Sequence, residues 1–179
     1  TVRAAAGREV GAGAVLLACL GWAFTFGVPW GNFWGKIGVT VVAACGYSLL
    51  WQRPRVALSW ASVGVGVLSA ALLYTVFLAG NAVVPLVVNG APGQVGRIYG
   101  LGAGSSMPWV FLLLFLVTGP GEEIFWRGFL QDRLEQRLGR ERGCIVATLV
   151  YGGVHVFSGN VMLILAALVA GAWWGAFYA

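Results

Sequence analysis

A cluster of ionisable residues stands inside an apolar part of the chain. Glu122, Glu123 and Arg127 follow shortly after the apolar run 108–117, which is typical of a membrane helix. On an insertion scale, one charged residue at the centre of such a helix costs about 2.5 to 3.5 kcal/mol. Ionisable residues in a membrane segment therefore indicate a functional site. The single histidine, His155, lies in a later apolar segment.

The spacing of the charged residues gives them different positions around a helix. Glu123 and Arg127 are four residues apart, so they share one face and can form an ion pair. Arg127 is then a structural partner, an organiser of the site, or both. Glu122 points about 100° away, which leaves one carboxylate free for chemistry. The alternative for Glu122 is a carboxylate neutralised by protonation in a dry site.

His155 is expected to reach the same site from a neighbouring helix. The charged stretch 131–142 joins two apolar segments, which are therefore antiparallel neighbours. At a rise of about 1.5 Å per residue, Glu122 lies roughly 14 Å and His155 roughly 18 Å from the cytoplasmic boundary. The similar depths predict one shared site. The alternative is a histidine whose nitrogens are satisfied within the core.

Carboxylates and an imidazole in a dry site can activate water by accepting its proton. Peptide-bond hydrolysis requires such a water, together with exclusion of bulk solvent. Other protease chemistries lack their residues in this chain. Asp132 is the only aspartate, so an aspartate pair is excluded, and neither a Gly-x-Ser-x-Gly nor a His-Glu-x-x-His motif occurs.

The composition predicts an all-α, polytopic membrane protein with a single integral-membrane domain over residues 1–179. The chain is 59% hydrophobic and 9% charged, whereas a soluble domain carries about 25% charged residues. Long continuous apolar runs disfavour a β-barrel. The net charge of +5 is explained by basic cytoplasmic loops, so no nucleic-acid partner is expected.

The apolar runs predict about six transmembrane helices. They cover residues 10–28, 33–51, 58–79, a segment that begins at Pro108, 144–157 and 161–179. The glycine-rich segment 89–107 is predicted to be an irregular external loop. Gly119, Pro120 and Gly121 predict a kink or a new helix whose first turn holds the two glutamates, where the helix dipole favours negative charge.

The basic residues predict the orientation. One side of the membrane receives most of them, and the other receives Lys36 and Arg97. The positive-inside rule makes the first side cytoplasmic, with both termini there, and we expect a multi-pass protein of a bacterial inner membrane. The cytoplasmic set is Arg3, Arg8, Arg53, Arg55, Arg133, Arg137, Arg140 and Arg142.

Glu122-Glu123-x-x-x-Arg127 resembles the EExxxR motif of the CPBP family, which covers type II CAAX prenyl proteases and the bacteriocin-processing or self-immunity proteins of the Abi group. Tyr151-x-x-x-His155 resembles that family's FxxxH motif, with Tyr in place of Phe. The resemblance covers residues 108–179, the part expected to form the protease core. The family's later HxxxN or HxxxD motif does not occur, so the chain is expected to be truncated before further helices.

The resemblance implies an intramembrane endopeptidase that cuts a membrane-associated protein or peptide. Glu122 and His155 would activate the water, and Glu123 and Arg127 would organise them. No cofactor is certain, and a divalent metal such as zinc stays open, with Glu122, Glu123 and His155 as its candidate ligands. Substrate lipidation and oligomeric state also stay open, although peptide maturation is favoured over prenyl-protein maturation.

Two alternatives to the protease remain. One is a non-catalytic bacteriocin-immunity or scaffold protein of the same fold. The other is a proton-coupled transporter that uses the Glu, Arg and His side chains as a relay. A transporter more often contains an internal repeat, and no repeat is visible in this chain.

Three smaller features complete the expectations. The cysteines Cys19, Cys45 and Cys144 form no CxxC pair and are interpreted as small hydrophobic residues. Gly171-x-x-x-Gly175 is a small-residue helix contact, expected to serve internal packing rather than dimerisation. Asn160 is expected to cap the last helix.

Overall fold

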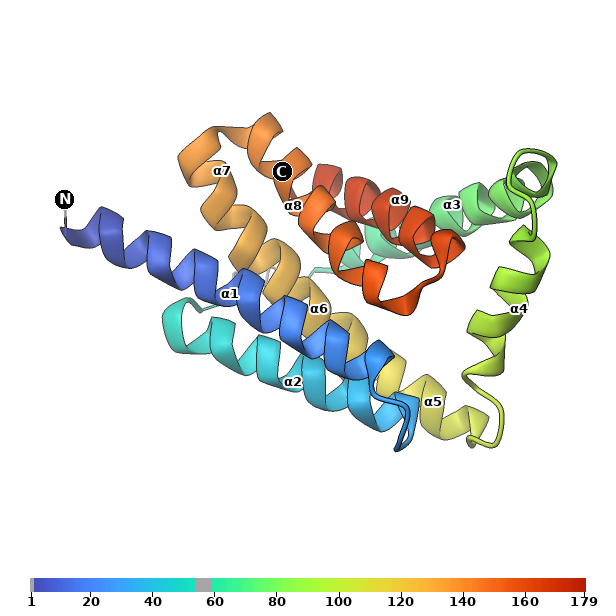
Figure 1. Cartoon of the computed structure of the whole chain (residues 1–179). Coiled ribbons are helices and arrows are strands. Elements are labelled where there is room, and N and C mark those ends of the chain that lie inside the picture. Colours follow the sequence, from blue (N-terminus) through green and yellow to red (C-terminus); the bar gives the residue numbers. More distant parts are fainter. Residues whose placement is uncertain (1, 54–58) are drawn as a thin grey trace.

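The computed structural model describes residues 2–53 and 59–179, and the side chains of the first helix from residue 11 onward. All regular structure in these ranges is helical, which confirms the all-α prediction (Figure 1). The elements are α1 (Val2–Gly27), α2 (Phe33–Trp51), α3 (Trp60–Val83), η1 (Val84–Leu86), α4 (Ala91–Gly100), α5 (Met107–Leu113), η2 (Leu114–Thr118), α6 (Gly119–Phe125), η3 (Trp126–Gln131), α7 (Asp132–Leu138), α8 (Arg140–Val154), η4 (His155–Ser158) and α9 (Val161–Tyr178).

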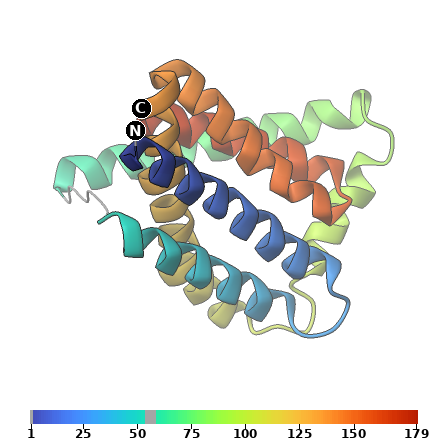
Figure 2. The same ribbon diagram turned by 60° about the vertical axis from the view of Figure 1, so that its left-hand side comes forward.

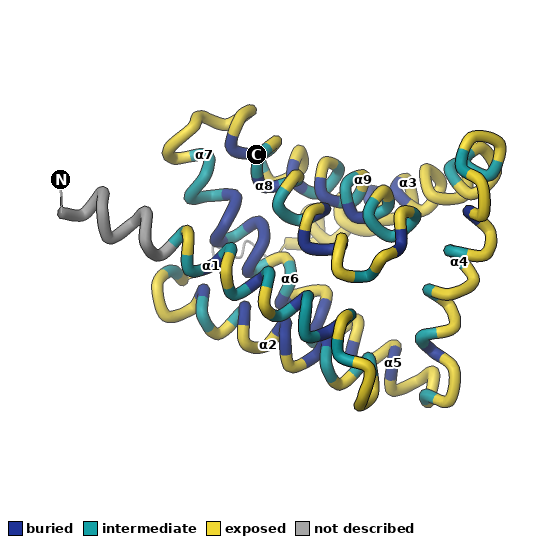
Figure 3. The backbone as a smooth tube through the Cα atoms, viewed as in Figure 1, coloured by how far each residue is buried: buried dark blue, intermediate teal, exposed yellow. Residues whose placement is uncertain are grey.

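Four helices of the described residues are long and apolar enough to cross a membrane. They are Phe33–Trp51, Trp60–Leu86, Met107–Leu138 and Val161–Tyr178, and Gly11–Gly27 is a shorter apolar helix. Their outward faces carry exposed large hydrophobic side chains, and α3 is exposed along most of its length (Figure 3). Such an apolar outer surface fits contact with lipid. The count of six spans stays a prediction.

The glutamates lie in one continuous helix, Met107–Leu138, which comprises α5, η2, α6, η3 and α7. Of the two predicted alternatives, a kink or a new helix, the new helix near Pro120 is wrong, because Thr118 and Gly119 keep helical backbone angles. The segment η2 is π-helical, and the N–H of Gly119 donates to the carbonyl of Leu114, five residues earlier. This wider turn accommodates Pro120 without a break.

Small residues bring the helices close together. A Cβ atom at Gly121 would collide with Val41 of α2, so the glycine lets the long helix lie directly on α2. Gly171 and Gly175 of α9 are buried against α8 and the long helix, which confirms internal packing for this pair. Close backbone approach through small residues is the usual way in which membrane helices associate.

The segment before the long helix is more regular than the sequence suggested. The prediction of an irregular loop at 89–107 is wrong for Ala91–Gly100, which forms α4. Gly90 has φ +77°, which few other residues adopt, and Pro92 lies in the first turn, where its missing N–H is not needed. Asn160 caps α9 as predicted, accepting from the N–H of Leu163 at 3.1 Å. Its amide also donates to the carbonyl of Gln94 at 2.8 Å, which joins α9 to α4.

The helices run between two ends of the molecule. The start of α1, the junction of α7 with α8, and the end of α9 lie toward one end, and the α1–α2 and α8–α9 connections lie toward the other (Figures 1 and 2). Arg137 and Arg140 flank the α7–α8 junction. That this end faces the cytoplasm stays a prediction. The side chains of Arg3 and Arg8, and all of Arg55, lie outside the described residues.

Because the two ends of the molecule are predicted to face opposite sides of the membrane, cysteines introduced at the two ends should be labelled from opposite sides. Cys19, Cys45 and Cys144 are unpaired, so replacing them with serine gives a cysteine-free background. Gly93→Cys on α4 and Arg137→Cys on α7 both place a thiol at an exposed position. With a membrane-impermeant maleimide on oriented vesicles, we expect the two thiols to react from opposite sides. Reaction of both from the same side would contradict the predicted topology.

Candidate active site

The guanidinium of Arg127 is buried between three helices, with 4% of the residue exposed. Its Nη1 lies 3.4 Å from Oε1 of Glu123, so the predicted i, i+4 ion pair is present. Its Nη2 donates to the carbonyl of Ala170 on α9 at 3.3 Å. Its central carbon lies 4.8 Å from the ring centroid of Tyr151 on α8, a cation–π distance. Arg127 is therefore an ion-pair partner and also a link from the long helix to α8 and α9.

The two glutamates point to different partners. Glu123 faces Arg127, and 48% of its side chain is exposed. Glu122 is only partly exposed, and its Oε2 accepts a hydrogen bond from the hydroxyl of Tyr151 at 3.1 Å. This divergence agrees with the separation of about 100° between adjacent helix positions. The two carboxylates are thus in different chemical surroundings.

A change of helix type positions His155. The α-helix α8 ends at Val154, and the backbone N–H of His155 donates to the carbonyls of Gly152 and Gly153 in a tighter 3₁₀ turn. The carbonyl of Tyr151, which an α-helical His155 N–H would have used, lies 2.8 Å from Nδ1 of the His155 ring. On the other side of the ring, Nε2 lies 3.4 Å from the indole Nε1 of Trp22. Both ring nitrogens therefore face protein groups.

Tyr151 is the residue that Glu122 and His155 share. Its hydroxyl holds Glu122, its carbonyl holds His155, and its ring lies edge-on to the imidazole with a centroid separation of 5.1 Å. In the part of the chain that the structure describes, no hydrogen bond joins Glu122 to His155. The structure thus brings Glu122, Arg127 and His155 together around one side chain. That Glu122 and His155 lie within direct or one-water hydrogen-bond reach of each other stays a prediction.

Aromatic rings close the inner side of the site. Trp22 of α1 lies edge-on to Trp126 at 5.4 Å between centroids, and Trp126 lies edge-on to Tyr151 at 5.1 Å. Tyr151 in turn contacts His155, as described above, and His155 lies 6.0 Å from Trp22 between ring centroids. The four rings therefore form a closed circle. Both indoles are 1% exposed, so this side of His155 is dry. The sequence offered no motif that would have singled out Trp22 or Trp126.

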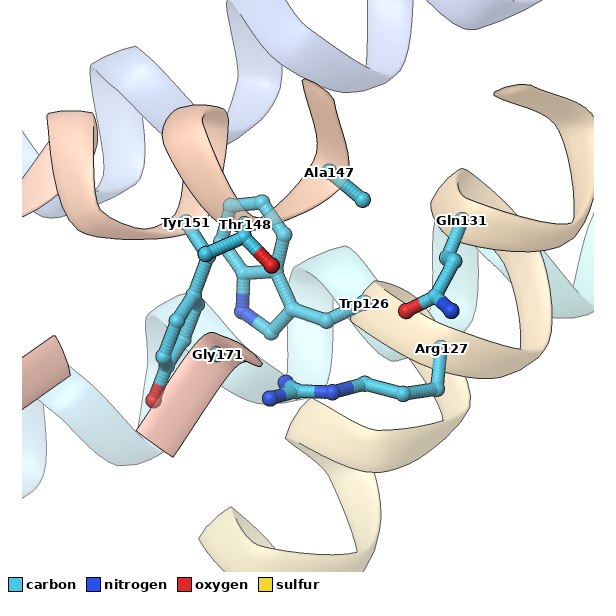
Figure 4. Close-up of a pocket in the computed structure, with 7 residues that line it drawn as sticks. All are labelled: Trp126, Arg127, Gln131, Ala147, Thr148, Tyr151 and Gly171. Atoms are coloured by element: carbon cyan, nitrogen blue, oxygen red, sulfur yellow. The ribbon is translucent and has the colours of Figure 1, made fainter. Parts of the chain in front are cut away.

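The void beside Arg127 is a packing gap rather than a substrate site. Figure 4 shows its lining, with the Arg127 side chain extended toward Tyr151 and Gly171. It has no room for the centre of a water molecule, so neither water nor substrate fits there. The lining residues are Trp126, Arg127, Gln131, Ala147, Thr148, Tyr151 and Gly171.

The candidate metal ligands do not converge. Over the described ranges, no group of three His, Cys, Asp or Glu side chains is placed to hold a metal ion. Glu123 is engaged with Arg127, and both nitrogens of His155 face protein groups. The donor set around Glu122, Glu123 and His155 therefore does not fit a metal centre in this arrangement, and no chemical step is assigned to a metal.

Comparison with known proteins identifies the C-terminal part of the chain. Residues 104–179 match the family model of Rce1-like type II CAAX prenyl endopeptidases. This part of the chain is therefore similar to that family, and the matched residues 104–179 are called the Rce1-like domain below. This agrees with the resemblance to the CPBP family, and the matched residues include Glu122, Glu123, Arg127 and His155. No curated protein and no solved structure matches the chain.

The Rce1-like domain has a defined place in the fold. It comprises the long helix, α8, η4 and α9, whereas α1 to α4 precede it. The apolar helices and the protease family together fit a multi-pass membrane protein with protease activity at the level of the family. The circle of aromatic rings extends beyond the domain, because Trp22 belongs to α1.

The contacts of Arg127 predict a loss of stability on substitution. Arg127→Ala removes the ion pair, the hydrogen bond to Ala170 and the contact with Tyr151. Because Glu123 is half-exposed, the loss should be smaller than the roughly 3–5 kcal/mol of a fully buried pair. We expect the free energy of unfolding in detergent to fall by about 1–3 kcal/mol. Arg97→Ala, at an exposed position on α4, is the control. Equal stability of Arg127→Ala and the wild type would refute the role of Arg127 as a link.

Proposed function

We propose that the protein is an intramembrane endopeptidase that hydrolyses a peptide bond of a membrane-associated protein or peptide. The observation that carries the proposal is the meeting of Glu122 and His155, from different helices, at Tyr151. They meet inside a bundle whose outer surface is apolar. The Rce1-like match over both residues supports the same activity.

Glu122 is the better candidate for the general base. Glu123 is held by the positive charge of Arg127, which favours its ionised form and occupies one of its oxygens. Glu122 uses Oε2 for the Tyr151 hydroxyl, which leaves Oε1 to accept a proton from water. A positioned general base contributes roughly 10²–10⁴-fold to a rate.

The proposed reaction consumes one water, and Glu122 ends it in the same protonation state in which it began. The water oxygen bonds to the carbonyl carbon of the scissile peptide while Glu122 takes one proton. The carbon–nitrogen bond of the tetrahedral intermediate then breaks, and Glu122 gives the proton to the leaving amine. His155, neutral and unprotonated on Nε2, orients the water when Nε2 exchanges the weak bond from Trp22 for one from the water.

The setting of the reaction is a cell membrane. Four long apolar helices support a multi-pass protein, and the arginines near the α7–α8 junction support a cytoplasmic N-terminus. The membrane we propose is a bacterial inner membrane. The family description names prenyl endopeptidases, so both lipidated and unlipidated substrates belong in an assay. We favour peptide maturation over prenyl-protein maturation.

Glu122→Gln tests the general base. The amide keeps the size of the side chain and removes the proton acceptor, so cleavage should fall at least about 100-fold while the protein stays folded. The assay uses protein in liposomes with two probes, a membrane-anchored peptide and a peptide with a prenylated cysteine near its C-terminus. Glu141→Gln, at an exposed position on α8, is the control.

The possible outcomes of that assay separate the alternatives. Cleavage by Glu122→Gln at the wild-type rate would transfer the role of base to Glu123. A folded wild-type protein that cleaves neither probe would favour an immunity or scaffold protein. Proton flux across the liposome membrane that Glu122→Gln abolishes would favour a transporter.

Tyr151→Phe separates orientation from chemistry. The substitution deletes the hydroxyl bound to Glu122 but keeps the ring and the carbonyl bound to His155. One such hydrogen bond contributes about 0.5–1.5 kcal/mol, so we expect cleavage to fall by about 2- to 10-fold. Tyr74→Phe, on the exposed face of α3, should cleave at the wild-type rate. A loss as large as that of Glu122→Gln would show that the hydroxyl takes part in the chemistry itself.

A further inference from the structure

Trp22 contacts the imidazole of His155 from outside the Rce1-like domain. It lies on α1, is 1% exposed, and directs its indole Nε1 at Nε2 of His155 over 3.4 Å. The match to the family begins at residue 104, so the family model includes no residue of α1. The contact therefore joins the N-terminal helix to the proposed active site.

Two separate contacts require the same tautomer of His155. The backbone carbonyl of Tyr151 can only accept, so the ring Nδ1 must carry the proton that it shares with that carbonyl. The indole of Trp22 can only donate, so Nε2 must be unprotonated. A neutral imidazole protonated on Nδ1 satisfies both partners, and no other protonation state does.

The packing of α1 holds the indole in place. The hydroxyl of Thr40 on α2 donates to the carbonyl of Gly21 at 3.1 Å and lies 2.9 Å from the hydroxyl of Thr25. These bonds flank Trp22 on both sides along α1. Trp126 of the long helix packs against the indole in a T-shaped arrangement, with 5.4 Å between the ring centroids. The α2 helix therefore holds this part of α1 in place, and Trp126 of the long helix packs against the indole that it carries.

We propose that Trp22 is a positioning residue that keeps His155 protonated on Nδ1, with the unprotonated Nε2 accepting from the indole. The expected effect of Trp22 on the rate of cleavage rests on the proposed function. The proposed effect of Trp22 on which ring nitrogen of His155 is protonated does not. The distance of 3.4 Å exceeds the usual range of about 2.7–3.2 Å, so the bond is weak. Because Nε2 has a single lone pair, it accepts either from the indole or from a water, and the proposed reaction requires the ring to exchange this weak bond for one to water.

The single histidine makes the proposal directly measurable. With ¹⁵N-labelled histidine, the two ring nitrogens of His155 are the only imidazole signals in the spectrum of the chain. We expect a protonated Nδ1 and an unprotonated, hydrogen-bonded Nε2. Trp22→Phe keeps an aromatic ring but loses the N–H, so the Nε2 signal should shift while Nδ1 stays protonated. Cleavage should fall about 2- to 10-fold, in kcat rather than KM, because Trp22 does not touch the substrate.

Trp173→Phe is the matched control. Its indole Nε1 donates to the hydroxyl of Ser69 at 2.8 Å, so the same chemical group is lost at a distant helix contact. Both signals of His155 and the rate of cleavage should stay at their wild-type values. Should Trp22→Phe fail to fold, a through-space correlation between an indole hydrogen and Nε2 of His155 in the wild-type protein makes the same test.

Three results would overturn the proposal. An Nε2 signal that Trp22→Phe leaves unchanged, or the absence of the indole correlation, would show that Trp22 does not bind His155. A protonated Nε2 in the wild type would refute the tautomer. If Trp22→Phe shifts the Nε2 signal of His155 but leaves kcat unchanged, Trp22 binds His155 without contributing to cleavage. If the wild type cleaves nothing, the proposed function fails, and the nitrogen spectrum still decides whether Trp22 sets the state of His155.

Discussion

The site depends on the need to satisfy one buried guanidinium. An uncompensated charge in an apolar bundle costs several kcal/mol, so Arg127 must find partners wherever the helices meet. It finds them on its own helix, on α9 and on α8, through Glu123, the carbonyl of Ala170 and the ring of Tyr151. Satisfying Arg127 therefore fixes the three helices relative to one another. The same arrangement turns the hydroxyl of Tyr151 toward Glu122.

Small residues make this arrangement sterically possible. In lipid, apolar side chains gain little by leaving the solvent, so helices associate through close packing and polar contacts. Gly171 lies against Tyr151, and Gly152 lies against Leu168, which brings α8 and α9 into direct contact. The wide π-helical turn before Gly119 lets the long helix continue past a proline. The result is a dry site on rigid elements, which suits a reaction that must control a single water.

The sequence predicted the parts of the site that depend on local spacing. The Glu123–Arg127 pair follows from positions i and i+4, and the shared location of Glu122 and His155 follows from the helical rise. Trp22 could not be predicted, because its contact spans 133 positions and depends on how α1 packs against α8 and the long helix. The helix α4 was missed for a different reason. Its many glycines are poor helix formers, and its contact with α9 outweighs that preference.

The central claim is that Glu122 and His155 act on one water in one site. A double-mutant cycle of Glu122→Gln and His155→Gln, measured as kcat/KM in liposomes, tests it most directly. Residues that act as a unit are not additive, so the account predicts that the double variant cleaves no more slowly than the slower single variant. Rate losses that multiply in the double variant would contradict a shared site and would show that the two residues act independently.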